Sequence, residues 1–244
     1  MHRFYADPDL SDDSCFVLTR EDTLHSVKVL RMHTGDRAEV ISCGKRFLAE
    51  IIGTGSDRTE LHPIELLPST EPRLSVTLFQ GIPKSDKMDW IVQKATELGA
   101  ERIIPVSFSR CVVRLNTNES QKKQERWQKI AREAGKQSGR CRIPEVLLPV
   151  SVKAMQDLFP SCDLVAVPWE DCPESGPLAF AKRHPSLSSL GIVIGPEGGI
   201  APEEIRSMKE AGGEPVTLGK RILRTETAGL AALSIFSALY GEME

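Results

Sequence analysis

Two glycine-bearing stretches in the last third of the chain decide the fold: IGPEGGI at residues 194–200 and LGKRILRTETA at residues 218–228. The first follows an apolar run, residues 190–194, that is typical of a buried parallel strand. After it, Pro202 and the two glutamates that follow predict the start of a helix. The first stretch is therefore expected to be a loop at the carboxyl end of a strand.

The second stretch repeats this arrangement with a short strand at 215–218, a tight loop at Gly219 and a helix over 225–239. Glycine has no Cβ and tolerates positive φ, so such loops allow a ligand to approach the backbone closely. Open α/β sheets bind ligands at the carboxyl ends of their strands. The two loops are therefore predicted to enclose one flat ligand.

The residues before these loops alternate between strand and helix patterns, which predicts an α/β domain with a mainly parallel sheet over residues 73–244. General topology rules favour an unthreaded, doubly wound sheet. The predicted strands are 74–79, 103–106, 145–148 and 163–167, and the predicted helices are 85–98, 118–139, 151–159 and 178–182.

The first 70 residues carry short strand patterns instead, which predicts a small β-barrel-like module. Its strands are expected at 15–18, 37–43, 46–52 and 59–67, with a helix that begins at Asp22 or Thr23. Residues 68–72, with a proline at each end, are the predicted linker between the two domains.

Composition excludes several classes of protein. No run approaches the roughly 18 apolar residues of a membrane helix, and residues 1–7 have no apolar signal core, so a cytoplasmic protein without a membrane partner is expected. The six cysteines form no C-x-x-C pair, and the histidines share no ligand spacing, so no metal site is predicted. Dinucleotide, P-loop and nucleophile-elbow motifs are absent as well.

Positive charge is concentrated in one part of the chain. The whole chain has a net charge of −3, yet residues 102–142 carry 11 Lys and Arg against 3 Glu, which leaves −11 on the remainder. On the predicted helix 118–139 these cations recur along one side. The simplest structural interpretation of such a side is a solvent-exposed face. Arg110 and Arg114 just upstream favour a track for RNA phosphates, whose binding weakens with salt.

Several spaced motifs resemble the RsmE family, the ribosomal RNA uracil-N3 methyltransferases of the SPOUT class. They are GPEGGI at 195–200, LGKRILRTETA at 218–228, QSGR at 137–140, KMD at 87–89, and His25 with VLR at 29–31 and GD at 35–36. The resemblance implies a PUA-like RNA-binding domain over residues 1–70 and a SPOUT domain over 73–244, whose chain forms a trefoil knot. It also implies a homodimer.

The resemblance implies S-adenosylmethionine as the cofactor and 16S rRNA, within the small ribosomal subunit, as the partner. The residues implied to bind the cofactor are Val167, Gly195, Pro196, Glu197, Gly198, Gly199, Leu218, Gly219, Ile222, Leu223, Arg224, Thr225 and Ala228. Those implied to contact RNA are His25, Arg31, Lys84, Lys87, Arg110, Arg114, Lys122, Arg126, Lys129, Gln137 and Arg140.

The implied reaction methylates N3 of a uridine, an atom that carries a proton at neutral pH and must lose it. A nearby cation stabilises the resulting negative charge. The candidates are Arg224 in the cofactor loop and Arg110, Arg114 and Arg140 in the basic segment. Glu197 and Glu226 are the candidate proton acceptors. Each carboxylate also has a structural interpretation, a hydrogen bond within the loop for Glu197 and a favourable charge at a helix amino terminus for Glu226.

Three alternatives stay open from the sequence. The chain could be a non-catalytic RNA-binding protein of ribosome assembly, an RNA 2′-O-methyltransferase, or a nucleotide-dependent metabolic enzyme. Binding of S-adenosylmethionine separates the enzyme from the assembly protein, the position of the new methyl group separates the two methyltransferases, and salt-dependent RNA binding argues against the metabolic enzyme.

Overall fold

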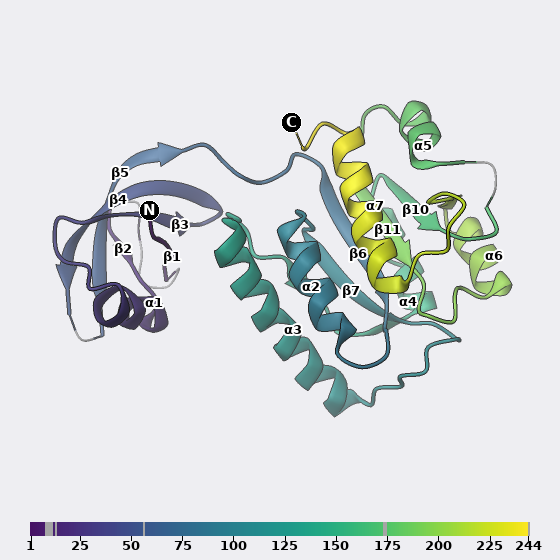
Figure 1. Cartoon of the computed structure of the whole chain (residues 1–244), viewed down its shortest axis with the longest axis horizontal. Coiled ribbons are helices and arrows are strands. Elements are labelled where there is room, and N and C mark those ends of the chain that lie inside the picture. The colour runs from purple at the N-terminus through teal and green to yellow at the C-terminus, as the bar shows by residue number, and fades with distance from the viewer. Residues whose placement is uncertain (8–11, 13, 56, 173–174, 244) are drawn as a thin grey trace. The chain divides into compact units, whose positions relative to one another are not determined.

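The computed structural model describes residues 1–7, 12, 14–55, 57–172 and 175–243, and the chain divides into two compact units. The first unit comprises Met1–Glu71 together with Gly135–Arg142. The second comprises Pro72–Ala134 and Ile143–Glu244 (Figure 1). The segment 135–142 thus groups with the first unit, although the linear sequence places it in the middle of the second.

The second unit is built on a seven-stranded sheet in which every pairing between described strands is parallel, as the sequence predicts. The strand order is β12-β10-β11-β6-β7-β8, and β9 also pairs with β7. The strands are β6 (Ser75–Gly81), β7 (Arg102–Ser107), β8 (Glu145–Val146), β9 (Val150–Ser151), β10 (Leu164–Pro168), β11 (Ser189–Ile194) and β12 (Gly213–Val216).

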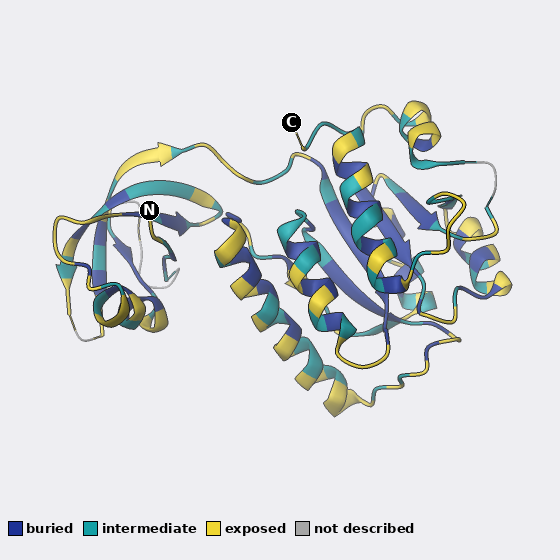
Figure 2. Ribbon diagram, in the orientation of Figure 1, coloured by how far each residue is buried: buried dark blue, intermediate teal, exposed yellow. Residues whose placement is uncertain are grey.

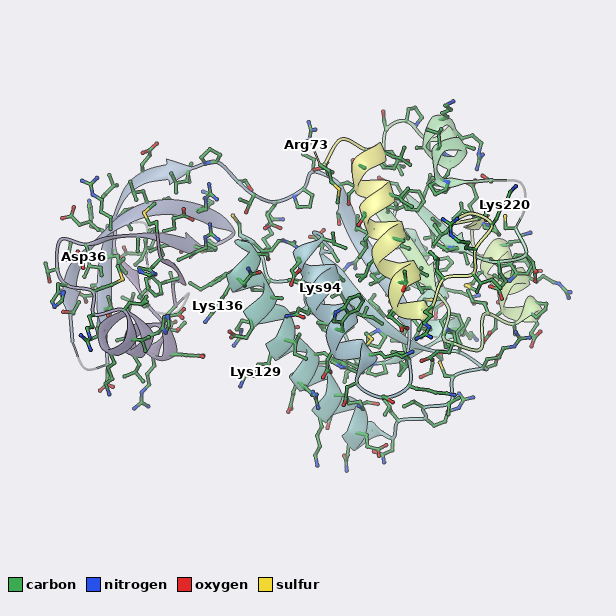
Figure 3. The ribbon with its side chains drawn as sticks, viewed as in Figure 1. Asp36, Arg73, Lys94, Lys129, Lys136 and Lys220 are labelled. Atoms are coloured by element: carbon green, nitrogen blue, oxygen red, sulfur yellow. The ribbon has the colours of Figure 1, made fainter. Side chains whose placement is uncertain are left out.

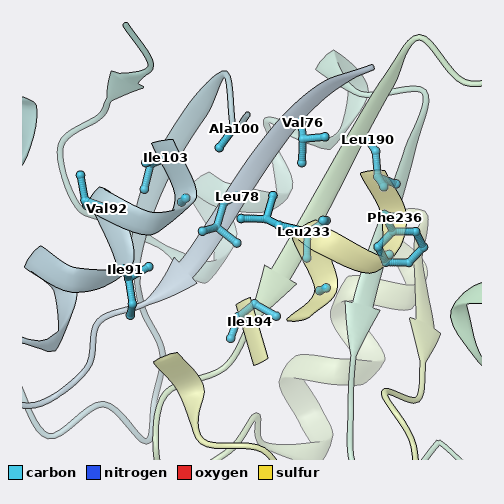
Figure 4. Packing of buried hydrophobic residues seen from close by; sticks show 14 of the residues in the cluster. Val76, Leu78, Ile91, Val92, Ala100, Ile103, Leu190, Ile194, Leu233 and Phe236 are labelled. Atoms are coloured by element: carbon cyan, nitrogen blue, oxygen red, sulfur yellow. The ribbon is translucent and has the colours of Figure 1, made fainter. Parts of the chain in front are cut away.

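Helices cover both faces of this sheet, because successive strand residues point to opposite faces. Leu78 and Ile192 belong to a cluster with residues of α2 (Lys87–Glu97), α3 (Thr117–Ser138), α5 (Pro177–Arg183) and α7 (Thr225–Leu239). Figure 4 shows Leu78 among its neighbours in this cluster. The next residues, Phe79 and Val193, pack against α4 (Val152–Gln156), the 3₁₀ helix η2 (Phe159–Ser161) and α6 (Pro202–Glu210). The central strands β6, β7, β10 and β11 are accordingly buried along most of their length, whereas the helices have one buried side (Figure 2).

The first unit contains a five-stranded sheet in the order β1-β3-β4-β5-β2. Its strands are β1 (Arg3–Tyr5), β2 (Phe16–Val17), β3 (Arg37–Ser42), β4 (Lys45–Thr54) and β5 (Thr59–Leu67). A bridge between Ala6 and Leu18 joins the two outer strands, so the sheet closes on itself like a small barrel. The predicted barrel-like module and parallel α/β sheet are confirmed, whereas the knot stays a prediction from the family resemblance.

The first helix begins earlier than its sequence pattern suggests. α1 spans Arg20–Leu24 and continues into the π-helix η1 (His25–Val29), and its N-cap is Thr19, whose hydroxyl accepts from the amide of Asp22. The prediction of a cap at Asp22 or Thr23 is therefore wrong. Asp22 is buried and binds the ammonium of Lys136 at 3.0 Å, so its carboxylate serves a tertiary contact.

Two further elements differ from the predictions. The helix expected at 151–159 ends at Gln156, and the strand expected at 215–218 is β12 at Gly213–Val216. β12 begins earlier because Gly213 and Glu214 pair with Val165 and Ala166 of β10. Within the described residues, no helix is long and apolar enough to cross a membrane.

Candidate active site

A cavity of about 530 Å³ lies between the two glycine loops of the second unit. Its walls come from the loop after β11, from the segment that leads into α7, and from the end of β10. The lining residues are Lys87, Pro168, Glu170, Ile194, Gly195, Pro196, Glu197, Gly198, Gly199, Ile200, Ile222, Leu223, Arg224, Thr225 and Ala228.

A second hollow of about 630 Å³ adjoins the first and shares Pro168, Glu170, Ile222, Leu223 and Ala228 with it. Its other lining residues are Trp169, Cys172, Thr217, Leu218, Gly219, Lys220 and Arg221. Both volumes fall in the range of about 300–1,000 Å³ that is usual for small-molecule sites. Because they share a wall, the two hollows can hold one elongated ligand.

Glycine is required in this site because backbone segments approach one another closely. A Cβ on Gly81, at the end of β6, would lie 2.5 Å from the nitrogen of Pro196. One on Gly195 would lie 2.6 Å from Ile200, and one on Gly198 would lie 3.0 Å from Arg110. The loop at 195–199 therefore folds tightly against β6 and against the segment that follows β7.

The other loop leaves open space beside its backbone. Gly219 has φ of +105°, a conformation that favours glycine, and a Cβ placed there would meet no atom within 4 Å. Ile222, in the same loop, is 86% exposed, which is unusual for an isoleucine. This side of the two hollows thus offers bare backbone and an apolar side chain to a ligand.

Three charged side chains connect the two loops at the edge of the cavity. The ammonium of Lys87, from α2, lies 3.2 Å from Glu197 of the first loop and 3.2 Å from Glu226 of α7. The Glu197 carboxylate also accepts from the amide of Lys84 at 3.0 Å. Lys87 is thus an ion-pair partner of both candidate bases.

These contacts change the acidity of two of the groups. Hydrogen bonds to Glu226 and then to Glu197 raise the pKa of Lys87. Burial alone would raise the pKa of Glu197, but hydrogen bonds from its own amide, from Lys84 and from Lys87 outweigh it, so the pKa lies below its ordinary value. A carboxylate held in this way is a weak proton acceptor, which favours the loop-organising interpretation of Glu197.

The candidate arginines differ in how they are held. Arg224 lines the cavity as the N-cap residue of α7, and its side chain forms no ion pair with any described residue. Arg110 donates to the carbonyl of Gly198 at 3.2 Å, and Arg114 donates to the carbonyl of Ser109 at 2.9 Å. All three are exposed, but only Arg224 faces the cavity without a structural partner.

Most residues that the sequence assigns to the cofactor line one of the two hollows, and Leu218 and Gly219 line the second. Val167 does not, because it is 1% exposed and packs in the core below. Its neighbours Pro168, Trp169 and Glu170 line the hollows instead. These three residues could have been predicted, because they follow directly after the predicted strand 163–167 and ligands bind at the carboxyl ends of such strands.

The cations of α3 are not equivalent. Arg126 is paired with Asp89 of α2, and the indole of Trp127 donates to the same carboxylate at 3.1 Å. Lys122 and Lys129 are exposed, and Lys129 projects from the helix in Figure 3. All three glutamates of this helix, Glu119, Glu125 and Glu133, are exposed as well, so its outer side is mixed in charge.

The remaining predicted RNA contacts lie in the first unit. His25 and Arg31 are exposed, and Arg31 has φ of +54°. Gln137 is also exposed. Arg140 is 5% exposed and forms an ion pair with Glu71 at 2.7 Å, so its guanidinium serves the packing of the unit rather than an open surface. No group of three or more potential metal ligands occurs among the described residues.

Comparison with known proteins identifies relatives of this chain. Residues 70–237 match the model of an RNA methyltransferase domain. The ribosomal RNA small subunit methyltransferase E of Bacillus subtilis is 37% identical over 97% of this chain and 96% of its own length, and that of Mycobacterium tuberculosis is 31% identical over 97% and 91%.

Two solved structures have a fold similar to that of this chain. A ribosomal RNA small subunit methyltransferase E from Neisseria gonorrhoeae, bound to S-adenosyl methionine, has a TM-score of 0.84 and 34% identity over the whole of both chains. A putative methyltransferase from Legionella pneumophila with bound cofactor has a TM-score of 0.73 and 30% identity over 97% and 96%. The chain therefore belongs to the ribosomal RNA small subunit methyltransferase E family, RNA methyltransferases of the SPOUT class.

Proposed function

We propose that this protein methylates N3 of a specific uridine in the 16S rRNA of the small ribosomal subunit, with S-adenosylmethionine as methyl donor. The observation that supports it best is the cavity between the two glycine loops, in a chain that matches the family over nearly its full length. The uridine N3 position follows from the family resemblance, and a 2′-oxygen is the alternative target.

The residues around the two hollows fit this cofactor. Its adenosine and its methionine tail make it elongated, which suits two hollows with a common wall. The backbone at Gly219 borders open space, so a ligand can approach it closely. Glu170 lines both hollows and matches a ligand that carries a sulfonium and an amino group, both positively charged.

Backbone groups of Gly195, Gly198, Gly199 and Gly219 would hold the cofactor's polar edges, and Leu218, Ile222 and Leu223 would contact its apolar face. When bound, the cofactor supplies an activated methyl group on a sulfonium. The protein's own contribution is to hold the target base in line with that group and to exclude water from the site.

Arg224 is the cation that we place beside the uracil ring. Loss of the N3 proton leaves negative charge on the neighbouring ring oxygens, and an unpaired guanidinium at the cavity stabilises it. Arg110 contributes less directly, because it supports the loop through the carbonyl of Gly198.

Glu226 is the better candidate for the proton acceptor. Within the part of the chain that the structure describes, the Glu226 carboxylate pairs with Lys87, whereas Glu197 also accepts from the backbone amide of Lys84 and has a lowered pKa. Movement of Lys87 from Glu226 to an RNA phosphate would free the Glu226 carboxylate for the proton. Lys87 would then link RNA binding to the proton transfer.

RNA binding is proposed to use the exposed cations of both units. In the second unit these are Lys84, Arg114, Lys122 and Lys129, and in the first His25 and Arg31 with the neutral Gln137. A homodimer is part of the proposal, and Trp90 of α2, at 45% exposure, is an apolar side chain that a second copy would cover. A cytoplasmic location is part of the proposal as well, since the proposed substrate is the small ribosomal subunit.

The test incubates the protein with assembled small ribosomal subunits and labelled S-adenosylmethionine, then maps the modified nucleoside. One 3-methyluridine per subunit is expected. A label on a 2′-oxygen would support the alternative methyltransferase, and cofactor binding without transfer would support an assembly factor. Arg224→Ala should lower kcat by about 100-fold or more, as expected when charge stabilisation is lost, without unfolding the protein. Arg206→Ala, an exposed arginine of α6, is the matched control.

A further inference from the structure

A buried chain of hydrogen bonds connects three segments around the cavity. Gln80, near the end of β6, is fully buried, and its amide nitrogen donates to the carbonyl of Gly81 at 3.1 Å and to the hydroxyl of Thr225 at 2.8 Å. That hydroxyl donates to the carbonyl of Gly195 at 2.6 Å. The chain therefore joins β6, the loop after β11 and the first residue of α7.

The direction of these hydrogen bonds is fixed by the groups themselves. A threonine hydroxyl has one proton, and here the carbonyl of Gly195 accepts it, so the oxygen of Thr225 receives its second bond from Gln80. The carbonyl of Gly81 can only accept. Both protons of the Gln80 amide are thus used, and its Oε1 is buried without a partner among the described residues.

Close packing leaves these groups no room to rearrange. A Cβ on Gly229 of α7 would lie 3.0 Å from Oε1 of Gln80, and one on Gly81 would strike the backbone at Pro196. Glycine on both sides lets α7 and the loop approach β6 to hydrogen-bonding distance. Rotation of the Gln80 amide would lose both of its donated bonds and gain at most one acceptor contact.

We propose that Gln80 is a positioning residue for the cofactor site. It orients the Thr225 hydroxyl, which holds the carbonyl of Gly195 and thereby fixes the spacing of the two loops that enclose the cavity. This proposal rests on the proposed function, because Gly195 and Thr225 both line the cavity assigned to S-adenosylmethionine. If the loops are already ordered before the cofactor binds, no free energy of binding is spent on ordering them.

Calorimetric titration of the whole protein with S-adenosylmethionine tests the proposal in three variants. Thr225→Val removes the hydroxyl at nearly constant shape, Gln80→Met removes the amide, and Thr225→Ser keeps the hydroxyl. Thr225→Val and Gln80→Met should each raise the dissociation constant by about tenfold, because a buried polar group is left unpaired in the loop support. Thr225→Ser should bind close to the wild type.

Thr96→Val is the matched control for general destabilisation. The Thr96 hydroxyl is fully buried in α2 and donates to the carbonyl of Val92 at 2.8 Å, away from the cavity lining. Its loss should lower the thermal unfolding temperature about as much as Thr225→Val does, with an unchanged dissociation constant. Circular dichroism spectra establish that each variant is folded.

The outcomes separate this proposal from the function on which it rests. Wild-type affinity in both Thr225→Val and Gln80→Met, or an equal loss in Thr96→Val, would overturn the positioning role and leave the methyltransferase intact. A wild-type protein that takes up no cofactor would instead refute the proposed function, and the positioning role with it.

Discussion

Gly229 shows how one residue of α7 depends on the buried groups beside the cavity. Replacement of a helical glycine by alanine usually stabilises a protein by about 0.5–1 kcal/mol. Here the added methyl would lie 3.0 Å from the Gln80 amide, which two hydrogen bonds hold in place. Gly229→Ala should therefore lower the free energy of unfolding, measured by urea denaturation, and weaken cofactor binding. A clear gain in the free energy of unfolding would contradict this, because it would show that the Gln80 amide can move aside for the added methyl group.

The second prediction at this scale concerns pH and the ion pairs of Lys87. Glu197 has a pKa below its ordinary 4.5, so its pairing stabilises the protein above that pH and is lost as the pH falls through the lower, folded value. Lys87 has a pKa above its ordinary 10.5, so its contribution is present below that pH and is lost as the pH rises through the higher, folded value.

Comparison of wild type with Lys87→Met by urea denaturation tests this window. The wild type should be the more stable protein between about pH 4.5 and 10.5, and the difference should shrink towards pH 3, as Glu197 takes up a proton. Lys94→Met is the control, because it breaks a pair with Glu97 on the same helix that is about as exposed as the Lys87–Glu197 pair. A stability difference that stayed constant from pH 3 to pH 7 would contradict the assignment.

The sequence located the cavity residues at this scale but not their partners. A glycine loop after a strand is a local pattern, so residues 195–199 and 218–228 were predictable. The hydroxyl of Thr225 points inward because it accepts a hydrogen bond from the side chain of Gln80. The two residues are 145 positions apart in the sequence. Such a pairing depends on the folded sheet, and local spacing carries no sign of it.

At the scale of elements, α3 is the helix whose role most needs a measurement. Lys122 and Lys129 are exposed, whereas Arg126 is occupied by Asp89. The pair Lys122→Ala and Lys129→Ala should reduce the slope of log affinity against log salt by about 2, since each phosphate contact contributes roughly 0.7–0.9. RNA binding measured at several salt concentrations gives this slope.

Lys182→Ala with Lys209→Ala, on α5 and α6, removes the same charge elsewhere and should leave the slope unchanged. Arg126→Ala alone should change the slope less than either lysine, because its guanidinium already has a partner. An unaltered slope in the α3 double variant would show that this side of the helix is a solvated face and not an RNA contact. The exposed Glu125 and Glu133 on the same helix are consistent with that alternative.

Element boundaries were harder to predict than the elements themselves. Apolar periodicity placed α2, α3, α7 and six of the parallel strands, but it missed the two-residue strand β9. It failed for α1, where Thr19 rather than Asp22 caps the helix, because a buried Asp22 is engaged by Lys136 from a distant segment. The three-residue strand β1 also escaped detection, since a run this short has no resolvable period.

At the scale of the whole molecule, Glu71 ties together the places where the chain enters and leaves the first unit. Its carboxylate binds the side chain of Arg140 at 2.7 Å and accepts from the amide of Cys141 at 2.6 Å. The hydroxyl of Thr70 donates to the carbonyl of Gly139 at 2.7 Å. The residues joined by the ion pair are 69 positions apart, so sequence periodicity gives no indication of this contact.

Arg140→Ala should therefore destabilise the first unit by about 3 kcal/mol, the low end for a buried pair, because the mostly buried carboxylate of Glu71 loses its charge partner. Denaturant unfolding, with a probe in each unit, measures this loss. The double variant Arg140→Met with Glu71→Gln should recover much of it, since no buried charge is left. If Arg140→Ala weakened RNA binding at full stability, the guanidinium would be an RNA contact after all.

Titration of the intact protein with S-adenosylmethionine in a calorimeter tests the central claim most directly. If the two glycine loops enclose a cofactor site, one molecule should bind per chain, with an affinity in the range of about 1 μM to 1 mM that is usual for substrates. Absence of binding heat across that range, in folded protein and with small ribosomal subunits present, would contradict the claim.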